Sequence, residues 1–272
     1  MSWPQQLGKE NCGSRPRCVL LTAGGTEEVA GRLTGLVGLD DVWIESSDKW
    51  MPRGRPQQME DGSWDAAPAD EAELDKPTDL LPYPVSERLK EWWLAKSENS
   101  PRTPGVDIAS TCTIGGKRGL LLIEAKAHWN ELNRSSSGKR LRGTACRDAI
   151  ENHENIGQAI QQAAAGLQAA TGGTWNISRD RHYQLSNRFA WSWKLASLGI
   201  PVVLLYLGFL NATDIAKGGN LFFSQNHWER ILRAHCEGVI DNTCWEKRLD
   251  VDGVTLLPLI QAYDQPFQPC ES

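Results

Sequence analysis

The chain has 272 residues, a formal net charge of −5 and 40% hydrophobic residues, enough for one large domain or two small ones. This mildly acidic balance argues against a protein that coats nucleic acid through its overall charge, although a local basic patch can still bind phosphates. The longest apolar stretch, 200–210, is too short to cross a bilayer, so we expect no transmembrane helix.

The seven cysteines predict neither a disulfide framework nor a zinc site. Their number is odd and no CxxC pair occurs, which is typical of a reducing compartment. Because residues 1–17 are polar and lack the apolar segment of a signal peptide, we expect a cytoplasmic protein. We attribute the twelve tryptophans to core and edge packing, with base-stacking platforms as the alternative.

Residues 1–50 are expected to be a strand–helix elaboration of a single domain spanning 1–272. The apolar run 18–23 is typical of a strand, and Gly24-Gly25 leads from it into a helical pattern. A strand, a glycine turn and a helix suggest phosphate binding at a helix N-terminus. Since the known glycine-rich phosphate motifs are absent, an ordinary turn is favoured.

Residues 51–84 are rich in Pro, Gly, Asp and Glu, which predicts an irregular, largely solvated acidic connection. Its acidic run, 70–75, is expected to be a solvated loop rather than a mimic of nucleic acid. After it, Ser86 is a candidate N-cap for a helix over 87–96.

The rest of the chain alternates strands and helices. We expect a hairpin over 106–128, helices over 145–170 and 182–198, a buried strand over 200–210, a helix over 228–239 and a strand over 251–259. This order predicts an α/β sandwich. Its core covers about 86–210, and residues 211–272 are a C-terminal helix and strand extension.

The hairpin carries the candidate chemistry. If Gly115-Gly116 is the whole turn, Asp107 and Glu124 lie directly opposite each other, with Cβ atoms about 5 Å apart. Side chains alternate along a strand, so Lys126 shares their face while the apolar residues between them face the core. A solvated strand face is the alternative interpretation, and a bulge would move Asp107 away from its partner.

Two facing carboxylates repel each other unless a cation lies between them. Mg²⁺ prefers carboxylate oxygens, so Asp107 and Glu124 are the candidate ligands of Mg²⁺ or Mn²⁺. The metal would supply Lewis acidity and lower the pKa of a bound water. Lys126 would then orient that water, help to deprotonate it, or neutralise charge on the phosphate.

Asp107 in TPGVDIAS and Glu124-Ala125-Lys126 in LLLIEAKAH resemble the PD-(D/E)xK nuclease superfamily, the restriction-endonuclease-like proteins. The order of elements over 86–210 is similar to the family core, although Val106 stands where the family has proline. The resemblance implies a restriction-endonuclease-like α/β/α sandwich with a mixed central sheet. It also implies Mg²⁺-dependent hydrolysis of phosphodiester bonds, most often in DNA.

The resemblance also suggests accessory residues. Some family members add a glutamate from the first helix, for which Glu87 and Glu91 are candidates. Others carry a glutamine on the helix after the Glu-x-Lys strand, which Gln158 resembles, although Gln162 stands where one subgroup has tyrosine. His128 is a candidate phosphate contact or second proton carrier, with a structural histidine as the alternative.

Basic residues downstream of the hairpin form a candidate clamp for the nucleic-acid backbone, with a solvated loop as the alternative. They are Arg134, Lys139, Arg140, Arg142 and Arg147.

The sequence therefore predicts a metal-dependent nuclease, expected to be a DNA endonuclease of restriction or defence type. Its catalytic residues are Asp107, Glu124, Lys126 and Gln158, and a homodimer or a larger defence complex is the candidate assembly. A catalytically inactive nucleic-acid-binding module on the same fold is the first alternative, and a nucleotide-binding regulator is the second. On the nuclease hypothesis, Glu124→Ala or Lys126→Ala abolishes cleavage without unfolding the protein.

Overall fold

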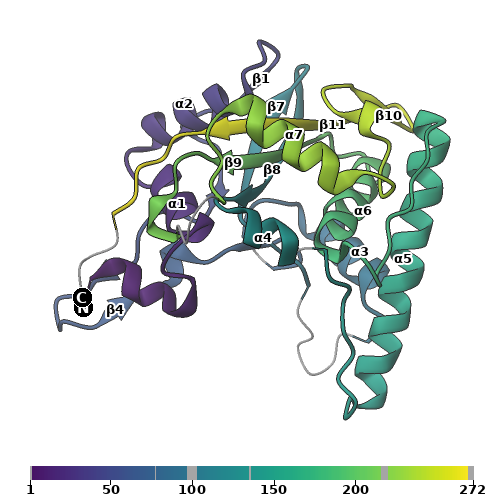
Figure 1. Cartoon of the computed structure of the whole chain (residues 1–272), viewed down its shortest axis with the longest axis horizontal. Helices are drawn as coiled ribbons and strands as arrows, with labels where there is room; N and C mark the ends of the chain where they lie inside the picture. The colour runs from purple at the N-terminus through teal and green to yellow at the C-terminus, as the bar shows by residue number, and fades with distance from the viewer. Residues whose placement is uncertain (1, 77, 97–102, 135, 216–219, 269–272) are drawn as a thin grey trace.

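The computed structural model describes residues 2–76, 78–96, 103–134, 136–215 and 220–268. Within these ranges, the protein is a mixed α/β structure built on a seven-stranded sheet, with strand order β1-β7-β8-β9-β11-β10 and β2 paired to β7 (Figure 1). The sheet strands are β1 (Val42–Trp43), β2 (Trp50–Met51), β7 (Ile108–Ile114), β8 (Lys117–Lys126), β9 (Val202–Phe209), β10 (Leu249–Val251) and β11 (Val254–Tyr263).

Helices pack on both faces of this sheet. They are α1 (Ser14–Leu21), α2 (Thr26–Val37), α3 (Tyr83–Trp93), α4 (Trp129–Arg134), α5 (Arg147–Thr171), α6 (Tyr183–Ser197) and α7 (Gln225–Cys236). Helices α1 and α2 share one apolar cluster with Ile123 and Leu205, whereas the other helices share a second cluster with Leu122 and Leu204. Alternate residues of β8 and β9 therefore face opposite cores. None of the described helices combines the length and apolarity that crossing a bilayer requires.

Strands β8, β9 and β11 are parallel neighbours, so the chain must cross over between them. Helices α4, α5 and α6 connect β8 to β9, and α7 lies between β9 and β11. All of β9 is buried, which confirms the predicted central strand over 200–210. The three parallel strands end at one side of the sheet, and Lys126 is the last residue of β8 there.

The predicted hairpin is confirmed, including its register. Ile114 pairs with Lys117 and Ile108 pairs with Ile123, so no bulge interrupts the ladder between them. Gly115 and Gly116 have φ angles of 54° and 77°, a backbone conformation that favours glycine over residues with a Cβ. The long helices predicted over 145–170 and 182–198 are also present, as α5 and α6.

The strand predicted over 18–23 is wrong, because these residues belong mainly to α1. A short apolar run fits a buried helix as well as a strand, so its period does not distinguish them. Pro16 lies in the first turn of α1, where a missing backbone N–H costs no hydrogen bond. Cys18 and Leu21 are fully buried under the sheet.

Ser86 is not a helix cap. Helix α3 begins three residues earlier, and the Ser86 hydroxyl donates a hydrogen bond to the Tyr83 carbonyl at 2.9 Å. Pro84 in the first turn supplies a preset φ that favours helix initiation at this point.

The connection over 51–84 is irregular, as predicted, but it is not fully solvated. It contains the two-residue strands β3 (Gln57–Gln58), β4 (Trp64–Asp65) and β5 (Ala72–Glu73). Ala72 and Leu74 are buried. Pairing of β5 with β6 (Gly105–Val106) brings the acidic run against the strand that precedes Asp107.

Candidate functional site

Asp107 lies in a one-residue break between β6 and β7, at the point where the ladder with β8 ends. Its carboxylate reaches toward β8, and Oδ2 accepts a hydrogen bond from the backbone N–H of Ala125 at 2.7 Å. Asp107 therefore lies next to the Glu124-Ala125 segment of β8, although it is not paired in the ladder, which ends at Ile108 and Ile123. The break frees the side chain of Asp107 to face the cavity instead of the core.

Glu124 is completely buried and is bound by two cations. Lys126 Nζ donates to one of its carboxylate oxygens, and Arg188 Nε donates to the other at 2.5 Å. Burial alone would raise the pKa of Glu124, but the guanidinium of Arg188 and the ammonium of Lys126 hold the pKa below its usual value. Glu124 is thus an ionised carboxylate in a charged cluster.

Lys126 is also buried, and it is the second cation of this cluster. Burial opposes its charge, but Glu124 and Asp107 hold its pKa above the usual value. Its Nζ also donates to the Ala125 carbonyl at 3.1 Å. This protonated state favours charge neutralisation over proton abstraction as the chemical role of Lys126.

Asp107 differs from Glu124 because Lys126 and Arg188 act on its charge without pairing with it directly. Among the residues that the structure describes, it forms no ion pair. Burial, followed by the negative charge of Glu124, raises the pKa of Asp107 to about 7. An under-compensated carboxylate beside a second carboxylate is suited to bind a hard cation.

This raised pKa has a consequence for stability. Below about pH 4 Asp107 is protonated in both the folded and the unfolded chain, and above about pH 7 it is charged in both. Stability is therefore lost as the pH rises through this window, because the folded chain binds the proton more tightly. Asp107 is partly exposed at the cavity wall, so solvent moderates the penalty.

We expect Asp107→Asn to raise the free energy of unfolding by roughly 1–3 kcal/mol at pH 8 without added metal. The asparagine oxygen still accepts from Ala125, while the penalty for the buried charge disappears. Urea unfolding from pH 4 to pH 8 measures the difference, which should grow with pH and vanish near pH 4. A difference that is constant with pH would contradict the inferred pKa.

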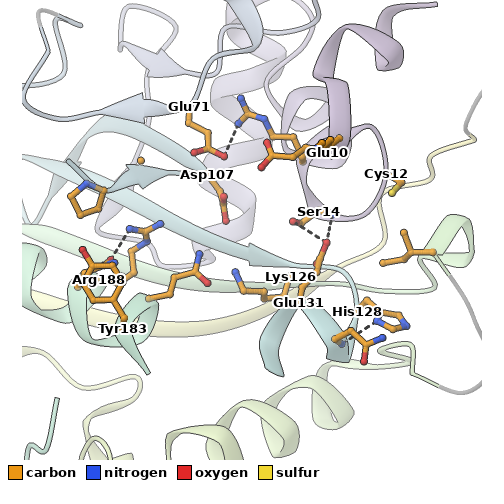
Figure 2. A pocket seen from close by; sticks show the side chains of 18 of the residues that line it. Glu10, Cys12, Ser14, Glu71, Asp107, Lys126, His128, Glu131, Tyr183 and Arg188 are labelled. Carbon is orange, nitrogen blue, oxygen red and sulfur yellow. Dashed lines mark hydrogen bonds and ion pairs between the residues drawn. The ribbon is translucent and has the colours of Figure 1, made fainter. Parts of the chain in front are cut away.

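Asp107 and Lys126 open onto a cavity of about 780 Å³ (Figure 2), whereas Glu124 is not among its lining residues. Its walls come from the segment 9–15, from residues 103–107, from the end of β8 and the residues after it, and from the start of α6. Figure 2 shows Asp107 and Lys126 together within this cavity. Of the three charged side chains that the sequence predicts on one face of the hairpin, Asp107 and Lys126 reach the cavity, and Glu124 is buried beside Lys126.

Helix α6 contributes residues to the cavity that the sequence interpretation missed. They share one side of the helix and are Tyr183, Gln184, Asn187 and Arg188. Arg188 holds Glu124 and also donates to Asn187 Oδ1 at 2.8 Å. The signal was a polar stripe at helical spacing that interrupts an otherwise buried helix.

Glu71 is the other residue that sequence reasoning missed. It was expected in a solvated loop, but it lines the cavity beside Asp107 (Figure 2). Arg15 forms an ion pair with it at 3.3 Å. Burial raises the pKa of Glu71, and the guanidinium of Arg15 opposes this shift.

The structure does not bring Gln158, Glu87 or Glu91 to this cavity. Gln158 is exposed on α5 and lines a separate hollow with Arg179. Glu87 and Glu91 line a third hollow on α3. The glutamine that does line the cavity is on α6, one helix later in the chain.

Of the basic residues predicted to form a clamp, the structure brings only some to the cavity. Lys139 lines the cavity, whereas Arg140 and Arg142 are exposed away from its walls. Arg147 is exposed and pairs with Glu151 at 2.7 Å. The side chain of Arg134 lies outside the described part of the structure.

The donor set of the cavity fits a divalent cation in part. Asp107 offers an oxygen with no balancing cation, but both oxygens of Glu124 are bound to Lys126 and Arg188. Within the described ranges, no three His, Cys, Asp or Glu side chains gather as a ready-made metal group. Asp107 would be the main protein ligand of a cation, with Glu124 shared and waters completing the shell. Comparison of the chain with protein-family models, with curated proteins and with solved structures finds no match.

Proposed function

We propose that the chain is a metal-dependent nuclease, with Asp107 and Glu124 holding Mg²⁺ or Mn²⁺ and Lys126 acting beside them. The observation that carries this proposal is the unbalanced Asp107 carboxylate, placed next to Glu124 and Lys126 at the wall of a cavity. A carboxyl group whose pKa is perturbed by burial and by a neighbouring charge, and which lines a cavity, is a candidate functional residue. The mixed sheet with helices on both faces supports a restriction-endonuclease-like sandwich.

The residues of the cluster have separate tasks in this proposal. Asp107 provides the ligand oxygen, and Arg188 keeps Glu124 ionised and oriented. A bound divalent ion supplies Lewis acidity and a water of lowered pKa. Lys126 stabilises the charge that develops on a phosphate oxygen, because its ammonium is fixed before the substrate arrives.

The substrate is nucleic acid, and we favour DNA, with the chain acting as an endonuclease of restriction or defence type. The test is incubation of the purified chain with supercoiled plasmid, linear duplex and linear single strands in Mg²⁺, Mn²⁺ or EDTA. We expect cleavage of at least one substrate with either metal and none in EDTA. Cleavage that persists in EDTA, or intact substrates under every metal condition, would overturn the proposal.

A catalytically inactive nucleic-acid-binding module is the second candidate. It is favoured by the saturation of Glu124, whose two oxygens are held by Lys126 and Arg188. If these ion pairs persist in the presence of metal, Glu124 cannot act as a ligand. Nucleic-acid binding by the wild-type chain, with no cleavage in Mg²⁺ or Mn²⁺, would favour this candidate.

A further inference from the structure

The cavity holds a cation that no carboxylate balances. Lys126 and Arg188 are paired with Glu124, and Arg15 is paired with Glu71. Lys139 instead places its Nζ 5.0 Å from the centre of the Tyr183 ring. No carboxylate among the described residues pairs with it, and burial lowers its pKa without an opposing acid. Lys139 is therefore fixed by an aromatic ring and is free to attract an anion.

His128 presents a second unused donor. Its Nδ1 accepts from the backbone N–H of Asn130 at 3.0 Å, so the ring proton is on Nε2. His128 is only 4% exposed, and Nε2 has no hydrogen-bond partner among the described residues. A buried donor without an acceptor is costly. His128 lines the cavity although its Nε2 atom is itself buried, and a ligand oxygen that reaches Nε2 would remove that cost.

These two donors lie on different sides of the proposed reaction centre. Figure 2 shows Lys126 between Tyr183, over which Lys139 lies, and His128. Both His128 and Lys139 line the same cavity. A ligand that reaches both within this cavity would pass Lys126 and would carry an acceptor oxygen on each side of it.

The size of the cavity limits the ligand. About 780 Å³ is within the range of pockets that hold small molecules. A duplex is wider than its own major groove, which already measures about 12 Å, so it needs a broader site than a single strand does. Figure 2 shows Glu10, Cys12 and Ser14 across the cavity from Tyr183 and Arg188, so the cavity has walls on two sides and one strand fits it better than two.

We infer that the cavity binds a single strand of nucleic acid, with phosphates on either side of the scissile one contacting His128 and Lys139. This inference rests on the proposed function, because it takes the reaction centre to be at Asp107 and Lys126. It adds that the substrate is single-stranded, and it selects His128 and Lys139 from the candidate phosphate contacts of the sequence as the residues that bind it. Neither contact depends on a bound metal, so binding is testable without cleavage.

The test is fluorescence anisotropy in EDTA with a labelled oligothymidine of about 12 nucleotides and a blunt duplex of equal length. We expect the single strand to bind at least about tenfold more tightly than the duplex. His128→Ala and Lys139→Met should each weaken strand binding about five- to tenfold. His128→Gln keeps a side-chain N–H and should recover part of the affinity.

Two matched controls separate these contacts from general effects. Lys194 on α6 also lies over an aromatic ring, 5.4 Å from that of Trp92, but it does not line the cavity. His227 also accepts a backbone N–H at Nδ1, at 3.3 Å, and lines another hollow. Lys194→Met and His227→Ala should bind the strand within about twofold of wild type. Unfolding midpoints of all variants confirm that each is folded.

The salt dependence of strand binding distinguishes the charged contact of Lys139 from the neutral contact of His128. Lys139→Met should make the slope of log affinity against log salt shallower by about 0.7, because one phosphate contact is lost. His128→Ala should leave the slope unchanged, since its donor is neutral. Equal affinity for strand and duplex, or wild-type binding by both His128→Ala and Lys139→Met, would overturn the inference.

The same experiments distinguish failure of the proposed nuclease function from failure of the single-strand inference. Strand binding through His128 and Lys139, without cleavage in any metal, would refute the nuclease and support the inferred substrate class. Metal-dependent cleavage with unimpaired strand binding in both variants would overturn the inference and leave the nuclease standing.

Discussion

Lys126→Met is expected to lower the rate of metal-dependent cleavage by about 10³-fold while the protein stays folded. Methionine keeps most of the side-chain length but removes the ammonium that lies between Glu124 and the cavity. The loss of one preorganised group that stabilises charge in the transition state is typically about 10²–10³-fold. Single-turnover rates at saturating enzyme measure the effect, since they exclude product release.

The fold should tolerate Lys126→Met because two compensations remain. Arg188 still pairs with Glu124, and Asp107, whose pKa is already raised to about 7, takes up a proton readily. Lys194→Met is the matched control and should cleave at the wild-type rate. A Lys126→Met protein that cleaves within about threefold of wild type would refute the assigned role of Lys126.

Glu124→Ala is expected to lower the free energy of unfolding by about 3–5 kcal/mol. Glu124 is fully buried and balances both Lys126 and Arg188. Its removal leaves two buried cations with only Asp107 nearby. Urea unfolding at pH 7 measures the change, and a change below about 1 kcal/mol would contradict the buried charge cluster.

The control for this prediction is Glu154→Ala. Glu154 is exposed on α5 and forms no ion pair among the described residues, so its loss should change stability by less than about 0.5 kcal/mol. On the proposed function Glu124→Ala is also expected to lose activity, but in a weakened protein. The sequence-based expectation that this variant loses cleavage without unfolding therefore understates the structural role of Glu124.

The hairpin could be predicted in detail because its information is local. Gly115-Gly116 selects a two-residue turn, and the turn fixes which residues of the two strands face each other. Alternation along β8 then places Glu124 and Lys126 on one face. The long helix α5 was predictable for a similar reason, since its apolar period extends over many residues.

The rest of the candidate site depends on contacts that are distant in the chain. Glu71 reaches the cavity through the pairing of β5 with β6, two-residue strands whose sequence carries no periodic signal. Arg188 meets Glu124 because α6 packs against β9. The family resemblance predicts Gln158 at the site, but α5 presents this residue to solvent. The local sequence pattern determines the pairing of β7 with β8, whereas tertiary packing determines that α6, and not α5, supplies residues to the cavity.

The most direct test of the central claim is a Mn²⁺ titration of the wild-type chain and of Asp107→Asn, followed by electron paramagnetic resonance of the free ion. We predict that the wild-type chain binds Mn²⁺ and that Mg²⁺ displaces it, because Asp107 and Glu124 offer hard oxygen ligands. Asp107→Asn should lose this binding, while Glu91→Gln, on a separate hollow, should retain it. Equal binding by Asp107→Asn and wild type, or no binding by the wild-type chain, would contradict the account.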